Sequence, residues 1–279
     1  MARSWLITGV SRGFGRVMAE QLLAAGDAVF GTVRREADGA GLSDRYPATF
    51  RMAVLDMADG PAIAPAVDLA FAVTGRIDVV VSNAGYGLFG AAEEASAAQI
   101  DDIVAVNLTG SIKLIGAALP HLRAQGGGRI IQISSYAGQV AFPGASLYHA
   151  TKWGVEGFVE AVAREVAGFN IGLTLIEPGG ARTGFRYGGA RVADPLPAYE
   201  GTPAHAFHAT LDPARGLAPG DPARMVRAII DSVDVTPAPL RLILGGQAQK
   251  MTVQALKRRL ADIEAQAGTA AAADHPPGE

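Results

Sequence analysis

The sequence predicts an α/β fold, a doubly wound parallel β-sheet of about seven strands with helices on both faces. Short aliphatic runs alternate with longer helical patterns along nearly all of the 279 residues, and such alternation favours right-handed crossovers. The runs at residues 77–81 and 129–133 are almost continuously apolar, as strands are when helices cover both faces of a sheet. A ligand site is therefore expected at the carboxyl ends of the strands.

Each element follows from the local pattern of side chains. The seven expected strands are residues 5–8, 28–33, 49–54, 77–81, 129–133, 173–176 and 240–244. The first helix follows the first strand, because apolar residues recur at helical spacing from Phe14 to Leu22 and Gly26 suits a left-handed C-cap. The other helices are expected near residues 62–71, 97–122, 148–167, 221–232 and 248–266.

The chain shows no internal repeat and no break in composition, so residues 1–266 are expected to form a single domain. Residues 183–220 are rich in Pro, Gly and Ala and include Phe185 and Phe207. Insertions of this length are often functional, and we expect a lid over a substrate site. Residues 267–279 have no periodic apolar face and are expected to be a disordered tail.

Composition excludes several classes of function. Cysteine is absent, which excludes disulfides, thiolate catalysis and cysteine-based zinc sites. The formal net charge of −3 gives no basic footprint for nucleic acid or for an anionic membrane. Neither a signal-peptide pattern nor a run of ~18 apolar residues is visible, so a cytoplasmic protein without a membrane partner is expected. His205 and His208 could share a helical face, but no acidic pattern completes a metal site, so none is expected.

The first expected strand runs directly into a glycine-rich turn, T-G-V-S-R-G-F-G at residues 8–15, and a helix follows at once. Glycines permit the tight turn and let backbone N–H groups approach a pyrophosphate at the positive end of the helix. A lone glycine pattern would be weak, because any turn between strand and helix can use glycine. Here the strand before the turn and the helix after it are those that a dinucleotide site requires.

The residues after the second expected strand indicate which dinucleotide is bound. NAD sites usually have a carboxylate there to bind the ribose diol, whereas this strand ends at Val33 and is followed by Arg34. Arg34 and Arg12 could pair with the 2′-phosphate of NADP. NADP(H) is therefore favoured, and the nearby Glu36 and Asp38 keep NAD(H) as the alternative.

Tyr148 and Lys152 are four residues apart and so share one face of an expected helix. Reduction of a carbonyl needs a proton donor beside the carbonyl oxygen, and oxidation of an alcohol needs the reverse. A nearby lysine favours phenolate and lowers the pKa of a tyrosine, which suits Tyr148 to acid–base catalysis. Ser134 and Ser135 follow the strand at residues 129–133, where a hydroxyl could hold a substrate oxygen or simply form a turn.

These motifs, in this order, resemble those of the short-chain dehydrogenase/reductase family, whose fold is of the Rossmann type. The resemblance covers residues 4 to about 260. Residues 8–15 match the family's TGxxxGxG, and Tyr148 with Lys152 forms its YxxxK. Residues 82–85 (S-N-A-G) resemble its NNAG element, with serine at a position that mainly ties strands together. Residues 178–183 resemble the stretch that contacts the nicotinamide carboxamide.

The resemblance assigns roles to single residues. Tyr148 is the expected acid/base, Lys152 tunes it and binds the nicotinamide ribose, and Ser135 orients the carbonyl. Asn107 matches the asparagine whose backbone binds a water linked to the lysine, although by itself it indicates only a polar residue or a local break inside a helix. Asp56 resembles the acid that meets the adenine ring. From the motifs and the resemblance together, the residues expected to bind the coenzyme are Gly9, Ser11, Arg12, Gly13, Phe14, Gly15, Arg34, Asp56, Met57, Asn83, Ala84, Gly85, Tyr148, Lys152, Pro178, Gly179 and Thr183.

The expected function is transfer of a hydride between NADP(H) and a ketone, an aldehyde or a secondary alcohol. Residues 84–90 and 240–245 loosely resemble hydroxysteroid- and retinol-type members of the family, which implies a hydrophobic substrate. Two alternatives stay open: an NADP-binding sensor or regulatory protein without turnover, and a dehydratase or epimerase on the same fold. The helices at 97–122 and 148–167 carry apolar residues beyond one stripe, and family members commonly pair through them, so a homodimer or homotetramer is expected.

Overall fold

Seven parallel strands form the central sheet of the computed structural model, which describes residues 2–185, 189–208, 211–212, 214 and 217–275. The strands are β1 (Ser4–Thr8), β2 (Ala28–Val33), β3 (Phe50–Val54), β4 (Val79–Ser82), β6 (Gly128–Ile133), β7 (Ile171–Pro178) and β9 (Arg241–Leu244). All neighbouring strands pair in parallel. The predicted fold class and its seven strands are confirmed. β7 extends past the expected run because Glu177, although charged, is fully buried within it.

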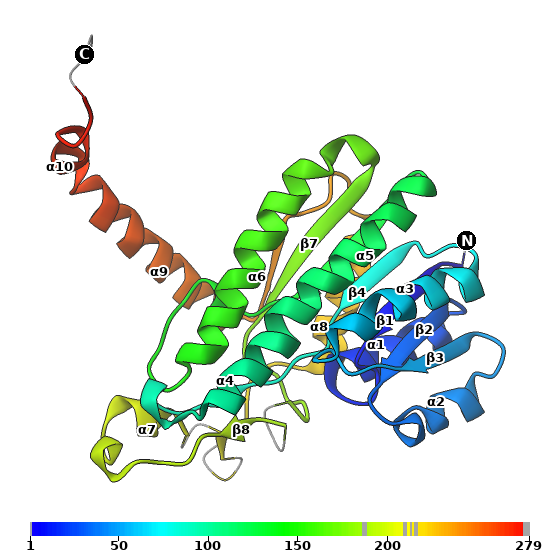
Figure 1. The fold of residues 1–279 in the computed structure, drawn as a ribbon, viewed down its shortest axis with the longest axis horizontal. Coiled ribbons are helices and arrows are strands. Elements are labelled where there is room, and N and C mark those ends of the chain that lie inside the picture. The colour runs from blue at the N-terminus through cyan, green and yellow to red at the C-terminus, as the bar shows by residue number, and fades with distance from the viewer. Residues whose placement is uncertain (1, 186–188, 209–210, 213, 215–216, 276–279) are drawn as a thin grey trace.

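Helices cover both faces of the sheet, as the apolar strands require. One hydrophobic cluster packs α1 (Gly13–Ala24) and α8 (Pro222–Asp231) against the sheet. A second cluster packs α3 (Gly60–Thr74), α5 (Gly110–Ala124) and α6 (Ser146–Glu165) against the opposite face, where the three helices lie side by side (Figure 1). This two-sided burial explains why the strands lack the alternation of a half-exposed sheet.

The order of the strands places a crevice between β1 and β4. The order of strands in the sheet is β3-β2-β1-β4-β6-β7-β9. From β1 the chain adds β2 and β3 on one side, then crosses back and adds β4 on the other side of β1. The loops that leave β1 and β4 therefore turn away from each other and open a cleft above the carboxyl ends of the strands. The glycine-rich turn follows β1 and Asn83 follows β4, so both predicted motifs lie at this switch point.

The predicted long helix at 97–122 is one continuous helical stretch with a widened turn. It comprises α4 (Ala97–Val104), a π-helical segment (Ala105–Thr109) and α5. Among the described residues, this stretch is long and apolar enough to cross a membrane by length and composition alone. Its side chains Leu114, Ile115, Ala118 and Leu122 are buried against the sheet and α3, as in a core helix.

Several smaller elements carry no strong sequence signal. The helix α2 (Ala40–Arg45) packs beside β3, and the two-residue strands β5 (Leu88–Phe89) and β8 (Arg191–Val192) pair with each other. Residues 183–220, for which a lid is expected, also contain a 3₁₀ turn (Pro197–Tyr199) and α7 (Pro203–His208). These elements fit the expected insertion of loops and short helices.

The C-terminal helices extend away from the body of the protein (Figure 1). They are α9 (Gly246–Glu264) and the short α10 (Ala267–Ala271). The expected disordered tail from residue 267 is therefore wrong for residues 267–271, because alanine has the highest intrinsic helix propensity and needs no apolar face to continue a helix. Residues 276–279 lie outside the described part of the chain.

Candidate active site

A cavity of about 1420 Å³ lies at the carboxyl edge of the sheet. It is lined by residues that follow β1, β2, β3, β4, β6 and β7, and by the first turn of α9. Of the residues predicted for the site from sequence, every one lines this cavity except Gly15 and Asn107. The structure thus brings together motifs that are separated by as much as 174 positions in the chain, from Gly9 to Thr183.

The glycine-rich turn leaves the first helical N–H groups without a side-chain acceptor. Gly9 and Gly13 have φ of +75° and +60°, in the left-handed region that favours glycine. A Cβ on Gly15 would lie 2.3 Å from the Gly9 carbonyl oxygen, so the helix can approach the turn only with glycine there. Arg12 is the N-cap of α1 and its side chain makes no capping hydrogen bond. These N–H groups are free to bind phosphate oxygens.

Asn83 fastens the end of β4 to this turn. Its Nδ2 donates to the Thr8 carbonyl at 2.7 Å and to the Gly9 carbonyl at 3.2 Å. In return, Thr8 Oγ1 accepts from the backbone N–H groups of Asn83 and Ala84, at 2.9 and 3.1 Å. Asn83 therefore holds together the two loops that border the crevice, through hydrogen bonds to the backbone of the glycine-rich turn. The neighbouring Ser82, the departure from the family pattern, donates to Ser111 Oγ at 3.2 Å and ties β4 to α5.

Two arginines at the β1–β2 end of the cavity are unpaired. Within the described residues, Arg12 and Arg34 form no hydrogen bond or ion pair through their guanidinium groups, and both line the cavity. Arg35 instead binds Asp38 with contacts of 2.7 and 3.1 Å, and this hydrogen bonding holds the pKa of Asp38 below its usual value. Of the two carboxylates that keep NAD(H) as the alternative, Asp38 is therefore already engaged by a neighbouring arginine.

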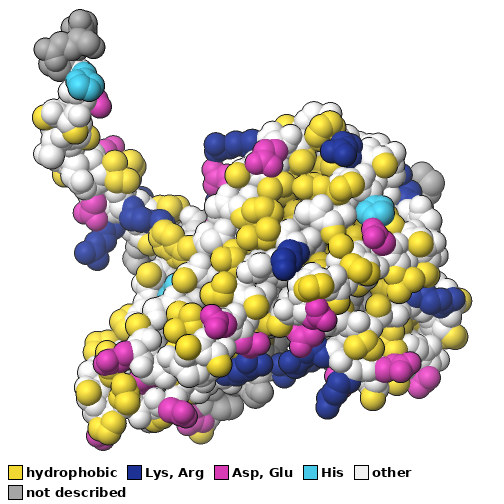
Figure 2. All heavy atoms as spheres, in the orientation of Figure 1, with side chains coloured by type: hydrophobic (Ala, Val, Ile, Leu, Met, Phe, Trp, Pro, Cys, Tyr) yellow, Lys and Arg dark blue, Asp and Glu magenta, His cyan; other side chains and the backbone are white. Residues whose placement is uncertain are grey.

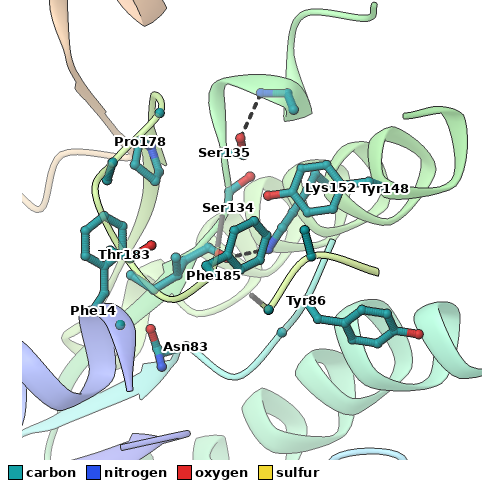
Figure 3. A pocket seen from close by; sticks show the side chains of 18 of the residues that line it. Phe14, Asn83, Tyr86, Ser134, Ser135, Tyr148, Lys152, Pro178, Thr183 and Phe185 are labelled. Carbon is teal, nitrogen blue, oxygen red and sulfur yellow. Dashed lines mark hydrogen bonds between the residues drawn. The ribbon is translucent and has the colours of Figure 1, made fainter. Parts of the chain in front are cut away.

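The catalytic side chains come from β6 and α6. Ser135 follows β6, and its Oγ accepts from the Ala137 N–H at 3.1 Å. Tyr148 and Lys152 stand one turn apart on α6 and are both buried. Lys152 Nζ donates to the Ile133 carbonyl at 2.8 Å and lies 5.7 Å from the centre of the Tyr148 ring. Figure 3 shows Ser135, Tyr148 and Lys152 gathered at one place in the cavity.

The protonation of Tyr148 differs from the sequence prediction. Burial raises the pKa of Tyr148 to about 12, against a smaller lowering by a hydrogen bond with Ser135. Burial also lowers the pKa of Lys152 to about 8, opposed by the charge of Glu156. The net shift of the Tyr148 pKa is therefore opposite to the expected lowering, because the loss of hydration on burial outweighs the lowering interaction. A phenol held protonated at neutral pH is a proton donor.

Asn107 lies in the π-helical segment and does not line the cavity. Its Oδ1 accepts from the Tyr86 N–H at 3.0 Å, and its Nδ2 donates to the Tyr86 carbonyl at 2.8 Å and to Thr151 Oγ1 at 3.3 Å. It therefore anchors the chain after β4 to α6, beside Lys152. The local break expected inside the long helix is this π-segment, a feature that often marks functional positions. The water relay implied by the resemblance stays a prediction.

Sequence reasoning missed the contacts that hold residues 191–205 against the rest of the protein. Glu94 is buried and accepts from the Ala91 and Leu196 N–H groups at 2.6 and 2.8 Å, and it pairs with His205 Nε2 at 2.6 Å. His205 therefore binds a carboxylate, and no cluster of metal ligands occurs within the described residues. Arg191 pairs with Asp102 at 2.6 Å. Neither pair follows a motif, because the partners are about 90 or more positions apart (205 − 94 = 111; 191 − 102 = 89).

The comparison with known proteins identifies the family. The sequence model of the short chain dehydrogenases matches residues 3–188. The chain belongs to this family. It is similar to the oxidoreductase BOA17 of Botryotinia fuckeliana, with 36% identity over 250 residues that cover 89% of this chain and 90% of the relative. A short-chain dehydrogenase of Streptomyces avermitilis has the same fold, with a TM-score of 0.90, 37% identity and 98% of each chain covered.

A further relative names its coenzyme. The NADPH-dependent 3-dehydrocapnine reductase of Ornithobacterium rhinotracheale is 34% identical over 184 residues, which cover 64% of this chain and 65% of the relative. This short-chain dehydrogenase is therefore an oxidoreductase of a family that binds a nicotinamide coenzyme. The cavity at the switch point of its sheet is the place where the fold binds such a ligand.

Proposed function

We propose that this short-chain dehydrogenase uses NADPH to reduce a hydrophobic ketone or aldehyde, with Tyr148 as the proton donor. The observation that carries the proposal is the meeting of Ser135, Tyr148 and Lys152 at one place in the cavity, with Lys152 Nζ 5.7 Å from the centre of the Tyr148 ring (Figure 3). Burial raises the pKa of Tyr148 to about 12, so its phenol is protonated at neutral pH. Reduction requires the protonated phenol, whereas oxidation requires the phenolate. At neutral pH this tyrosine is therefore better prepared for reduction.

The residues of the cavity fit an NADP(H) molecule. The uncapped N-terminus of α1 and the close approach at Gly15 suit a pyrophosphate. The unpaired Arg12 and Arg34 suit the additional 2′-phosphate of NADP, since guanidinium groups bind phosphate through paired hydrogen bonds. The NADPH-dependent relative supports the same choice. Residues 178–183 would hold the nicotinamide end, and reduced nicotinamide supplies a hydride to the carbonyl carbon when bound.

The chain's own residues would then complete the reduction. Ser135 donates a hydrogen bond that orients the carbonyl oxygen, and Tyr148 transfers its phenolic proton to that oxygen, so the product is the alcohol. Lys152 places a positive charge near the phenolate that remains and so stabilises it. The retention of all three side chains supports an enzyme over a sensor that binds the coenzyme without turnover.

The test is a turnover assay with the purified protein. Ketones and aldehydes are supplied with NADPH or NADH, and oxidation of the nicotinamide is followed by its absorbance. The proposal predicts reduction of at least one hydrophobic carbonyl compound and a higher kcat/KM for NADPH. Tight NADPH binding with no turnover of any carbonyl compound would favour the sensor instead.

A further inference from the structure

Phenylalanine is concentrated at the cavity. The chain contains ten phenylalanines, and five of them line this one cavity. Phe14 belongs to the glycine-rich turn at the coenzyme end. The other four, Phe89, Phe142, Phe185 and Phe207, form what we call the aromatic wall, and they lie around Tyr148.

The aromatic wall is continuous with the catalytic tyrosine. The Tyr148 ring centre lies 5.9 Å from that of Phe89 and 6.0 Å from that of Phe185. Phe207 is 5.3 Å from Phe89, and Phe142 stacks on Phe207 at 4.7 Å. These separations are those of favourable aromatic pairs. Figure 3 shows Phe185 next to Tyr148 and Lys152 in the cavity.

The four rings of the aromatic wall come from four separate parts of the chain, and Gly87 leaves space for two of them. Phe89 comes from β5, Phe207 from α7, and the other two from loops. A Cβ on Gly87 would lie 2.5 Å from the Phe89 ring and 3.3 Å from the Phe185 ring. None of the four belongs to the two clusters that pack the sheet, and three of them are only half-buried. Half-buried rings that face a cavity gain most when an apolar ligand covers them.

Most charged side chains of the cavity lie at the coenzyme end or are paired with each other. Among the described residues that line the cavity, they are Arg12, Arg34, Asp56, Asp102, Lys152 and Arg191. The first three follow β1, β2 and β3, at the far side of the sheet from β6 and α6. Asp102 and Arg191 neutralise each other at 2.6 Å, and Arg191 also covers the Tyr86 ring at 4.0 Å. Lys152 donates to the Ile133 carbonyl at 2.8 Å. A carboxylate placed against the wall would lose its hydration, and the four phenylalanines offer it no counter-ion in return.

From this arrangement we infer that the substrate is a neutral carbonyl compound with an aromatic ring attached at or next to the carbonyl carbon. The inference rests on the proposed reduction, which fixes the carbonyl oxygen at Tyr148. The groups bonded to that carbonyl carbon then lie within reach of Phe89 and Phe185. An aromatic ring there adds ring-to-ring attraction to simple burial, which favours it over a saturated ring of similar size by about tenfold.

Three matched ketones test the inference, each supplied with NADPH: acetophenone, cyclohexyl methyl ketone and 4-acetylbenzoate. We expect kcat/KM for acetophenone to exceed that for each of the other two by about tenfold or more. Equal or better reduction of the cyclohexyl ketone or of the carboxylate overturns the inference while the proposed reductase stands. The same holds when other carbonyl compounds are reduced and acetophenone is not. Failure to reduce any carbonyl compound overturns the proposed function itself.

Variants of the wall test whether these rings carry the preference. In Phe89→Leu and Phe185→Leu an apolar side chain remains but the ring next to Tyr148 is lost, so the ratio of kcat/KM for acetophenone over cyclohexyl methyl ketone should fall toward one. Phe169→Leu is the matched control, because Phe169 is exposed, lies outside the cavity and should leave the ratio unchanged. NADPH affinity, measured by titration, verifies that each variant is folded. An unchanged ratio in both wall variants contradicts the inference.

Discussion

Glu156 on α6 and Glu177 at the end of β7 share one guanidinium, that of Arg241. Arg241 Nε lies 3.0 Å from a Glu156 oxygen and 3.2 Å from a Glu177 oxygen, and both carboxyl groups are buried. The second oxygen of each has no hydrogen-bond partner within the described residues. Burial raises the pKa of Glu177 to about 7, and the charge of Glu156 adds to the rise. A proton on Glu177 relieves the repulsion between the two buried carboxyl groups.

The stability of the protein should therefore decrease as pH rises from about 4.5 to about 7. Because the pKa of Glu177 is higher in the folded chain than its ordinary value of 4.5, the folded state binds the extra proton in this window, and the free energy of unfolding falls with pH. In Glu177→Gln the amide donates to Glu156 at every pH, so the variant should lose this decrease, on the order of 1–3 kcal/mol.

Urea unfolding at pH 5 and pH 8 measures the effect in wild type and variant. Glu160→Gln is the matched control, because Glu160 contacts the same Arg241 at 2.7 Å but is partly exposed and has a lowered pKa. The control should keep the wild-type decrease between the two pH values. If Glu177→Gln shows the same decrease as wild type, Glu177 is not the group that binds the proton.

Arg34→Ala should weaken the binding of NADPH and leave the binding of NADH nearly unchanged. Loss of one charge-assisted contact with the 2′-phosphate costs about 1.5–3 kcal/mol, which corresponds to about ten- to a hundredfold in Kd. Arg35→Ala serves as the control, since Arg35 is already bound to Asp38 and its side chain is mostly exposed. Calorimetric titration of the wild type and of both variants with each coenzyme measures these Kd values. Equal affinity of the wild type for NADPH and NADH argues against the assignment of Arg34.

Gly157→Glu should convert an oligomer to monomers. Ala150, Trp153, Gly157 and Ala161 form an exposed stripe on α6, and Figure 2 shows hydrophobic side chains gathered over α5 and α6. A side chain at Gly157 meets nothing within 4 Å in the monomer, so the fold should tolerate it. Light scattering should give a dimer or tetramer for the wild type and a monomer for the variant. Leu69→Glu, at an exposed position on α3, should not change the mass. A monomeric wild type at micromolar concentration would refute this prediction.

The sequence alone predicted the features of the fold and the site that depend on residues close together in the chain. The apolar runs predicted all seven strands, and the separation of Tyr148 from Lys152 by one helical turn predicted their common face. The glycine-rich turn was recognisable because a strand, three glycines and a helix are contiguous in the chain. In each case the determining residues are neighbours, so their pattern carries the geometry.

The remaining features depend on contacts between distant residues. Phe89 and Phe142 carry no motif, and only the folded chain brings them to Phe207. The direction of the shift in the Tyr148 pKa depends on how deeply its side chain is buried. Spacing shows that a lysine is near a tyrosine, but it does not show whether burial or the lysine charge has the larger effect on the pKa of the tyrosine.

The central claim is that Tyr148 donates the proton in carbonyl reduction. In Tyr148→Phe the ring and its packing against Phe89 and Phe185 remain, and only the hydroxyl is lost. The most direct measurement is the single-turnover rate of NADPH oxidation with a reducible carbonyl compound, together with NADPH affinity by titration. The account predicts nearly unchanged affinity and a rate lowered by about a hundredfold or more, the usual contribution of a positioned general acid. A variant that binds NADPH normally and retains more than about a tenth of the wild-type rate would contradict it.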